Sequence, residues 1–194
     1  QGQYASVMEG VTNGQGETCK ARPSSFKGDD RLPVESVSWH DAKAFCGELN
    51  RRFGGTLPKG YRFDLPTESQ WEYACRAGTT TDWHYGDSLG STQANFDGDY
   101  PGGNAAKGKY LEKTTAVRSY RPNARGLYDM HGNVFEFCLD WWADDITGLD
   151  GAVNADGANL AEGGTAGTYR VIRGGAWAGT PQPCLASSRS TGST

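Results

Sequence analysis

The 194-residue sequence contains no long apolar run and no cluster of basic residues. The first absence excludes a membrane-spanning helix, which needs about 20 consecutive apolar residues, and the first residues show no signal-peptide pattern. The second absence makes nucleic acid an unexpected partner, because the formal net charge is −4 and no stretch collects Lys or Arg.

Side chains that commonly perform catalysis or bind transition metals are also few. The three histidines are widely spaced and the five cysteines are too dispersed for a zinc motif: His40, His84, His131, Cys19, Cys46, Cys75, Cys138 and Cys184. No Ser/His/Asp arrangement and no phosphate-binding loop is present. His131 falls in a turn, where a hydrogen-bonding role is expected. The cysteines that lie in apolar stretches are expected to be small buried thiols.

Glycine, in contrast, is abundant, with 28 residues, whereas hydrophobic residues make up only 36% of the chain. This combination predicts a loop-rich fold rather than long regular elements. Six Trp and nine Tyr can still bury large areas and form a compact core. The length suits one domain, so residues 1–194 are interpreted as a single domain.

Capping residues and apolar periodicity predict two main helices. Ser38 is a good N-cap, Asp41 follows at the third helical position, and apolar residues recur at helical spacing as far as Phe53. These apolar residues are expected to belong to the core. Thr67 caps the second helix, with Gln70 as its capping-box partner.

The other elements are expected to be short. Residues 1–8 indicate the end of an amphipathic helix, and strands are expected at 61–65, 117–120, 135–142 and 169–177. Residues 79–116 have almost no periodicity, and an irregular segment of that length is usually functional or held by a ligand or an ion. The acidic residues of the loop 143–167 do not match an EF-hand and are expected to be solvated.

The most informative stretch runs from Gly126 to Trp142. A turn rich in Gly and Asn precedes a strand in which aromatic residues alternate with polar ones, which predicts one strongly apolar face. At the junction, the side chains of Asn133 and Glu136, with the backbone carbonyl of Val134 between them, offer hard oxygen ligands of the kind that calcium prefers. A simpler interpretation stays open, in which Asn133 caps the turn and Glu136 is only the polar side of the strand.

Four stretches together resemble the motifs of the formylglycine-generating-enzyme (sulfatase-modifying factor) family. They are Pro33-Val34-Glu35-Ser36-Val37-Ser38-Trp39, Leu65-Pro66-Thr67-Glu68-Ser69-Gln70-Trp71-Glu72-Tyr73-Ala74-Cys75-Arg76, Gly126-Leu127-Tyr128-Asp129-Met130-His131-Gly132-Asn133-Val134-Phe135-Glu136-Phe137 and Arg170-Val171-Ile172-Arg173-Gly174-Gly175-Ala176-Trp177. The resemblance implies an α+β, C-type-lectin-like fold, loop-rich with short strands and lacking the family's first and last strands. It leaves function open, because the family holds oxidases, accessory domains and binding proteins.

The resemblance also carries expectations for individual residues. A second calcium site of the family would begin at Asn95 and Phe96, but no carboxylate stands near its expected second half at 108–110, which argues against that site. Cys75 could approach Cys184 and form a disulfide in an oxidising compartment, the alternative being that both stay free thiols.

Oxidases of the family bind copper through two cysteines five residues apart, because soft thiolates suit Cu(I). Here the first position is Gly179 and only Cys184 is present. The chain is therefore expected not to be an enzyme, and copper is not an expected cofactor. The alternative is an oxidase with a replacement ligand, or an accessory domain of a larger enzyme.

The segment after Trp177 resembles the variable region of proteins that are diversified by retroelements, such as the Treponema variable protein. That resemblance implies a non-catalytic, ligand-binding surface built from Trp177, Ala178, Gly179, Thr180, Gln182, Pro183, Leu185 and Ser188, with Trp141 and Trp142 at its rim. The expected partner is a protein or a cell-surface ligand. The location stays open, with the bacterial cell surface or the extracellular space favoured. An ordinary family loop of drifted sequence is the competing interpretation.

Overall fold

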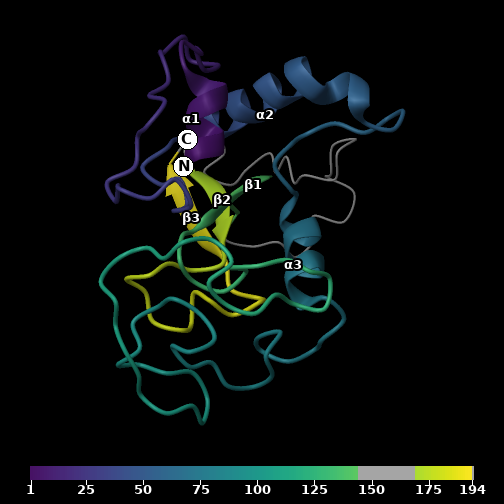
Figure 1. Cartoon of the computed structure of the whole chain (residues 1–194). Helices are drawn as coiled ribbons and strands as arrows, with labels where there is room; N and C mark the ends of the chain where they lie inside the picture. Colours follow the sequence, from purple (N-terminus) through teal and green to yellow (C-terminus); the bar gives the residue numbers. More distant parts are fainter. Residues whose placement is uncertain (144–168, 194) are drawn as a thin grey trace.

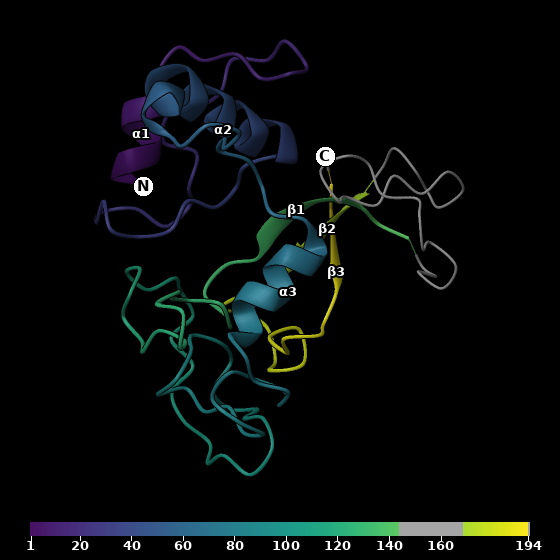
Figure 2. The ribbon, with the colours of Figure 1, turned by 90° about the vertical axis from the view of Figure 1, so that its right-hand side faces the viewer.

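The computed structural model describes residues 1–143 and 169–193. It contains the helices α1 (Gly2–Met8), α2 (Trp39–Phe53) and α3 (Glu68–Arg76), the short 3-10 helix η1 (Gly54–Thr56), and the strands β1 (Glu136–Trp141), β2 (Tyr169–Arg173) and β3 (Ser190–Ser193). Helices α1 and α2 lie at one end of the molecule, the sheet and α3 in the middle, and the long loops at the other end (Figure 1, Figure 2). This loop-rich α+β architecture confirms the expected fold class.

Both predicted helices begin where their capping residues stand. The Ser38 hydroxyl accepts the Asp41 N–H at 3.1 Å and the Asp41 carboxylate accepts the Ser38 N–H at 3.1 Å, so a complete capping box starts α2. Thr67 and Gln70 form the equivalent box at α3. The apolar stripe of α2 is less buried than expected: only Trp39 is buried, and Phe53 is 48% exposed. The expectation that the whole stripe is core was therefore wrong.

The three strands form one antiparallel sheet in the order β1-β2-β3. Its better-buried face carries Cys138 and Val171, which pack against Trp71 and Cys75 of α3. The aromatic face of β1 is only half-buried, and Phe135 just before it is 39% exposed. The strand was predicted correctly but its buried face was not, because α3 covers the side on which Cys138 lies.

Two other predicted strands are absent from the described residues. The main chain of Phe63 bonds to the side chain of Asn50, whose amide both donates and accepts at 2.7 Å and so occupies the place of a neighbouring strand. At 117–120 the chain makes a turn, with Arg118 at φ 64°. Conversely β3 was missed, because Ser, Thr and Gly have no strand periodicity; its pairing with β2 creates it.

All five cysteines are free thiols. Cys75 and Cys184 belong to different hydrophobic clusters, and the His131 ring contacts both residues. Its Nε2 lies 3.8 Å from the Cys75 sulfur, and its Nδ1 lies 2.7 Å from the Cys184 carbonyl oxygen. The disulfide considered from the sequence is therefore not formed, whereas the alternative of free thiols is confirmed.

The irregular segment 79–116 is ordered by its own packing. Trp83, Leu89 and Phe96 form a cluster with Cys184 from the C-terminal segment, and a Cβ at Gly102 would lie 2.5 Å from the Trp83 ring. Close approach of this kind requires glycine. Across the described ranges, no helix is long and apolar enough to cross a membrane. The acidic loop discussed above lies outside the described residues, except for Ala143.

Candidate functional site

The C-terminal segment begins where β2 ends at two glycines. Gly174 and Gly175 have φ values of 89° and 74°, a region that side chains disfavour. A Cβ on Gly175 would lie 2.5 Å from the Cys184 sulfur and 3.0 Å from the Cys184 nitrogen. The glycine pair therefore lets the chain turn and then fold back onto itself, so that 176–188 forms a compact set of turns rather than a free tail.

Within these turns, buried and exposed side chains are interleaved. Pro181, Cys184 and Ala186 are buried. The exposed positions are Ala178, Thr180, Gln182 and Ser187, and the half-buried ones are Trp177, Gly179, Pro183, Leu185 and Ser188. Every residue predicted from the sequence to bind a ligand is thus at least partly accessible. Pro181 and Ala186, which the sequence did not single out, fix the segment to the core.

Arg173 holds the C-terminal part of the segment, around Ala186 and Ser188, from the protein interior. Its guanidinium is completely buried, donates to the carbonyl oxygens of Ser188 and of Ala186 (2.9 Å), and forms an ion pair with Glu72 at 2.6 Å. Arg189 adds a second ion pair, to Glu68, also at 2.6 Å. Two carboxylates of α3 are therefore connected through arginines to the backbone that displays the surface.

Trp177 joins this surface to two other loops. Its indole lies edge-on to Phe26 and parallel to Tyr110, with centroid distances of 5.3 and 6.3 Å. It also lines a cavity of about 280 Å³ beside the sheet. Two tryptophans were expected at the rim. The Arg189 guanidinium lies 4.7 Å from the centre of the Trp142 ring, whereas Trp141 stacks on Arg170 of β2. The structure thus brings only Trp142 next to this segment.

Asn133 holds the turn that supports Trp177. Its side-chain oxygen accepts from the Thr115 N–H at 2.9 Å and from the Asn95 amide at 3.2 Å, and its own amide donates to the Thr115 carbonyl at 3.2 Å. Its backbone carbonyl accepts the Trp177 N–H at 3.0 Å. Both Asn133 oxygens therefore already accept hydrogen bonds within the protein. Although Asn133 lies close to Glu136 in the sequence, its side chain is directed toward Thr115 and Asn95.

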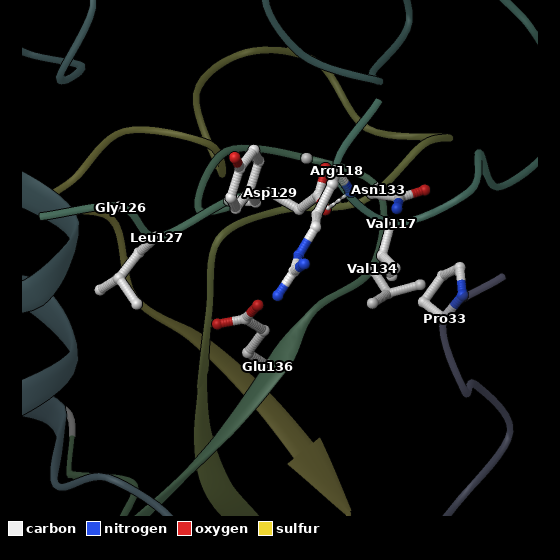
Figure 3. A pocket seen from close by; sticks show the side chains of 11 residues that line it. Pro33, Val117, Arg118, Gly126, Leu127, Asp129, Asn133, Val134 and Glu136 are labelled. Atoms are coloured by element: carbon white, nitrogen blue, oxygen red, sulfur yellow. Dashed lines mark hydrogen bonds between the residues drawn. The ribbon is translucent and has the colours of Figure 1, made fainter. Parts of the chain in front are cut away.

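The carboxylate that shares a cavity with Glu136 is that of Asp129 (Figure 3). Both side chains line a cavity of about 310 Å³, together with Asn133 and Val134. Glu136 accepts from the Trp71 indole N–H at 2.5 Å. One Asp129 oxygen accepts the backbone N–H of Arg118 at 2.8 Å, whereas the other is buried and has no partner in the described part of the chain.

Burial also raises the pKa of both carboxyl groups, that of Glu136 to about 7. An orphaned oxygen and a second desolvated carboxylate would both be stabilised by a cation. The sequence analysis did not single out Asp129, although it lies within the central motif. In the structure Asp129 is a non-glycine residue at φ 58°. No group of three or more His, Cys, Asp or Glu side chains that could hold a metal occurs in the described ranges, so a cation here would also need backbone oxygens.

The two residues at the start of the second calcium motif are buried within the loop core. The Asn95 amide donates to the Lys113 carbonyl at 2.9 Å, while its oxygen is buried without a partner among the described residues. Phe96 is completely buried. A Cβ on Gly98 would lie 2.4 Å from the Lys109 carbonyl oxygen, so the loop closes on backbone here and presents no carboxylate.

Comparison with known families places this fold. The family model of the sulfatase-modifying factor enzyme 1-like domain matches residues 1–194. The chain belongs to this family. It is 36% identical over 159 residues to the formylglycine-generating enzyme of Streptomyces coelicolor, covering 79% of this chain and 45% of that one. It is 34% identical over 146 residues to the serine/threonine-protein kinase pkn1 of Chlamydia caviae, covering 75% and 19%. The chain thus spans less than half the length of either relative.

Among solved structures, Treponema denticola variable protein 1 superimposes with a TM-score of 0.66 and 26% sequence identity, covering 100% of this chain and 76% of that one. The sulfatase-modifying factor fold expected from the four motifs is therefore confirmed. The similarity extends to enzymes and to a variable protein, so membership of the family does not choose between catalysis and binding.

At the two positions where family oxidases carry copper-binding thiols, this chain has Gly179 and Cys184. The Cys184 sulfur is completely buried, 3.8 Å from the Thr180 carbonyl, and burial raises the pKa of its thiol to about 12. Gly179 has no side chain, and its backbone carbonyl accepts the Asp97 N–H at 2.9 Å. The residues present thus provide one protonated, enclosed thiol where the copper chemistry requires two accessible thiolates.

Proposed function

We propose that this domain is a non-catalytic binding module, whose ligand contacts the surface formed by Trp177, Ala178, Gly179, Thr180, Gln182, Pro183, Leu185 and Ser188. The observation that carries the proposal is the interleaving of buried anchors with exposed positions along this segment. Exposed positions whose backbone is fixed from below can change their side chains without loss of the fold. Recognition loops on a rigid scaffold have this property.

The composition of the surface supports a protein or cell-surface ligand. One large, half-buried aromatic residue, Trp177, stands beside small polar residues such as Thr180 and Ser188. Binding loops of antibodies combine rigid aromatic anchors with adaptable Ser, Gly and Asn in the same way. The likeness to a variable protein supports diversification of these positions by a retroelement, and a bacterial cell-surface or extracellular location would suit such a role.

The test is to sequence the 3′ end of this gene deeply across a population of the source organism. Diversification predicts that the codons of Ala178, Thr180 and Gln182 vary strongly. The codons of Arg173 and Cys184, which build the scaffold, should stay fixed. If the exposed codons are as constant as the buried ones, the diversified-surface proposal fails.

An oxidase, or an accessory domain of one, is the competing function, favoured by the identity to the formylglycine-generating enzyme. It would require Cu(I) on Cys184 with a replacement ligand for Gly179. Titration of the reduced protein with Cu(I) against a chelating competitor decides this point. We expect no tight stoichiometric site, and a tight site that is lost in Cys184→Ala would establish the alternative.

We further propose that calcium stabilises the domain. The sequence proposed Asn133, Val134 and Glu136 as its site. Asn133 and Asp129 both line the Glu136 cavity, but the Asn133 oxygen already accepts hydrogen bonds, whereas one Asp129 oxygen has no partner among the described residues. We therefore favour Asp129 in place of Asn133, with Glu136 and the backbone near Val134. Hard carboxylate and carbonyl oxygens suit calcium. We expect Glu136→Ala to lower the melting temperature in calcium by several degrees and EDTA to lower it no further. A wild-type protein whose melting temperature is indifferent to EDTA would contradict the metal proposal.

A further inference from the structure

Arg118 is the cationic residue among those that line the Asp129–Glu136 cavity. Its backbone N–H donates to Asp129, and both residues are held at positive φ, 64° and 58°. From there the Arg118 side chain extends toward the Glu136 carboxylate (Figure 3). The guanidinium also lies 5.4 Å from the centre of the Tyr128 ring. A positive charge of the protein itself thus lines the cavity in which a bound cation would be stabilised.

Within residues 1–143 and 169–193, this arginine does not form a conventional salt bridge. None of the ion pairs among the described residues includes Arg118. One oxygen of Asp129 stays without a partner, although the guanidinium lines the same cavity. Arg118 is an exposed residue, and without such short contacts to a carboxylate of the described residues its side chain is not fixed in one position.

Arg118 also lines a second, larger cavity of about 1,000 Å³, which lies against the half-buried apolar stripe of α2. Pro33 and Val117 line both cavities as well, so Arg118 stands at their shared border. Rotation about the side-chain bonds of Arg118 would move its guanidinium from the Asp129–Glu136 cavity into the larger one. No movement of the backbone would be needed.

We propose that the Arg118 guanidinium and a calcium ion are alternative occupants of the Asp129–Glu136 cavity. This inference rests on the calcium site proposed above and adds the residue that sets its affinity. Two cations a few ångströms apart repel each other strongly in a partly buried site, so calcium enters only when the guanidinium leaves. The apparent affinity for calcium is then reduced by the fraction of molecules in which the cavity is free.

Calorimetric titration with calcium of wild type, Arg118→Met and Arg121→Met tests the proposal. Arg121 is an exposed arginine close by in the sequence, so its substitution changes the net charge equally without touching the cavity. If the guanidinium occupies the cavity in about nine molecules in ten, Arg118→Met binds calcium about tenfold more tightly. Arg121→Met keeps the wild-type affinity. Equal affinities for all three proteins would overturn the exchange and leave the calcium site intact, whereas no binding by any of them would overturn both.

Melting temperatures separate exchange from a purely structural role of Arg118. In EDTA, Arg118→Met should melt below wild type, because the cavity then lacks the guanidinium that the proposal places in it. In saturating calcium the difference should disappear. A variant that is destabilised equally in both conditions would overturn the proposal. Arg118→Lys, which keeps the charge on a more compact group, should bind calcium with an affinity between those of wild type and Arg118→Met.

Discussion

At the scale of single residues, the buried Arg173 shows how much of the candidate surface depends on one side chain. It lies under the C-terminal segment and connects α3 to the Ser188 and Ala186 carbonyls. A buried arginine of this kind is tolerated only because several acceptors surround it. If the arginine is removed, the Ser188 and Ala186 carbonyl oxygens lose a charged donor beneath the segment.

We therefore expect Arg173→Met to lower the free energy of unfolding by about 3 kcal/mol. Methionine fills a similar volume but leaves two carbonyl oxygens without this donor and leaves Glu72 with Arg76 as its remaining ion-pair partner. Chemical denaturation would measure the change. The matched control is Arg125→Met, because Arg125 is an exposed arginine that contacts the exposed Tyr73. A loss below about 0.5 kcal/mol for Arg173→Met, as expected for surface substitutions, would show that the ion pairs do not anchor the segment.

At the scale of elements, the turns between Trp177 and Ser188 separate display from support. Exposed side chains alternate with buried ones in a segment that has neither helical nor strand periodicity. The support comes from elsewhere in the chain, because Cys184 packs with Trp83 and Phe96, while Ala186 packs with the α3 cluster.

This division predicts two classes of substitution. A combined variant at Ala178, Thr180 and Gln182, with each replaced by Ser, should change the free energy of unfolding by less than about 0.5 kcal/mol per site. Replacement of the buried Ala186 by Leu should cost about 1 to 3 kcal/mol, because extra methylenes in a packed core strain it. Thermal unfolding of the two variants side by side measures the contrast. Similar losses for both classes would mean that the segment is not a tolerant display surface.

At the scale of the whole molecule, stability should depend on pH through a pair of stacked imidazoles. His131 is 2% exposed and stacks on His84 at 4.7 Å. Its Nδ1–H donates to the Cys184 carbonyl and its Nε2 accepts the His84 backbone N–H, so the neutral form is the one that fits. Burial, and for His131 also the neighbouring His84 ring, lowers the pKa values to about 4 for His84 and about 3 for His131.

Both histidines bind protons more readily in the unfolded chain, where the pKa is about 6.5. Stability should therefore fall as the pH drops from about 6.5 toward 3, by up to about 1.4 kcal/mol per pH unit for each histidine. Replacing His131 by Asn should flatten this slope by about half. Comparing the variant with wild type isolates His131, because Glu136 and the other carboxyl groups contribute to both proteins. Urea unfolding at several pH values measures the slopes, and parallel curves would contradict the prediction.

The proposed calcium site shows that local sequence indicates a motif but not which of its side chains come together. Oxygen-bearing residues beside a turn pointed to the region 133–136, and Glu136 does line a cavity there. Adjacency in the chain suggested Asn133 as its neighbour. However, Asn133 is at φ 70°, and its side chain is directed toward Thr115 and Asn95. Both Asn133 and Asp129 line that cavity, but only Asp129 keeps an oxygen without a hydrogen-bond partner in the described part of the chain. That difference depends on a backbone angle and on a loop that lies far away in the sequence.

The sequence by itself determined the family, the two capped helices and the strand after the central turn. Local signals encode these features: Ser38 and Thr67 cap by bonding within one turn, and the alternation after Asn133 has a period of two. The absence of a thiol at Gly179 is likewise a property of the sequence alone. Such features need no information about contacts between distant residues.

The tertiary structure alone decided which face of β1 is buried, whether Cys75 and Cys184 pair, and where the small polar residues of β3 go. Each of these results depends on a partner that is remote in the sequence. Helix α3 covers Cys138, the His131 ring contacts both Cys75 and Cys184, and β2 provides the hydrogen bonds that make 190–193 a strand. A strand, a buried thiol and an exposed loop are each stabilised by the residues that pack on them. The residues of such an element therefore permit its conformation, but residues elsewhere in the chain decide whether it forms.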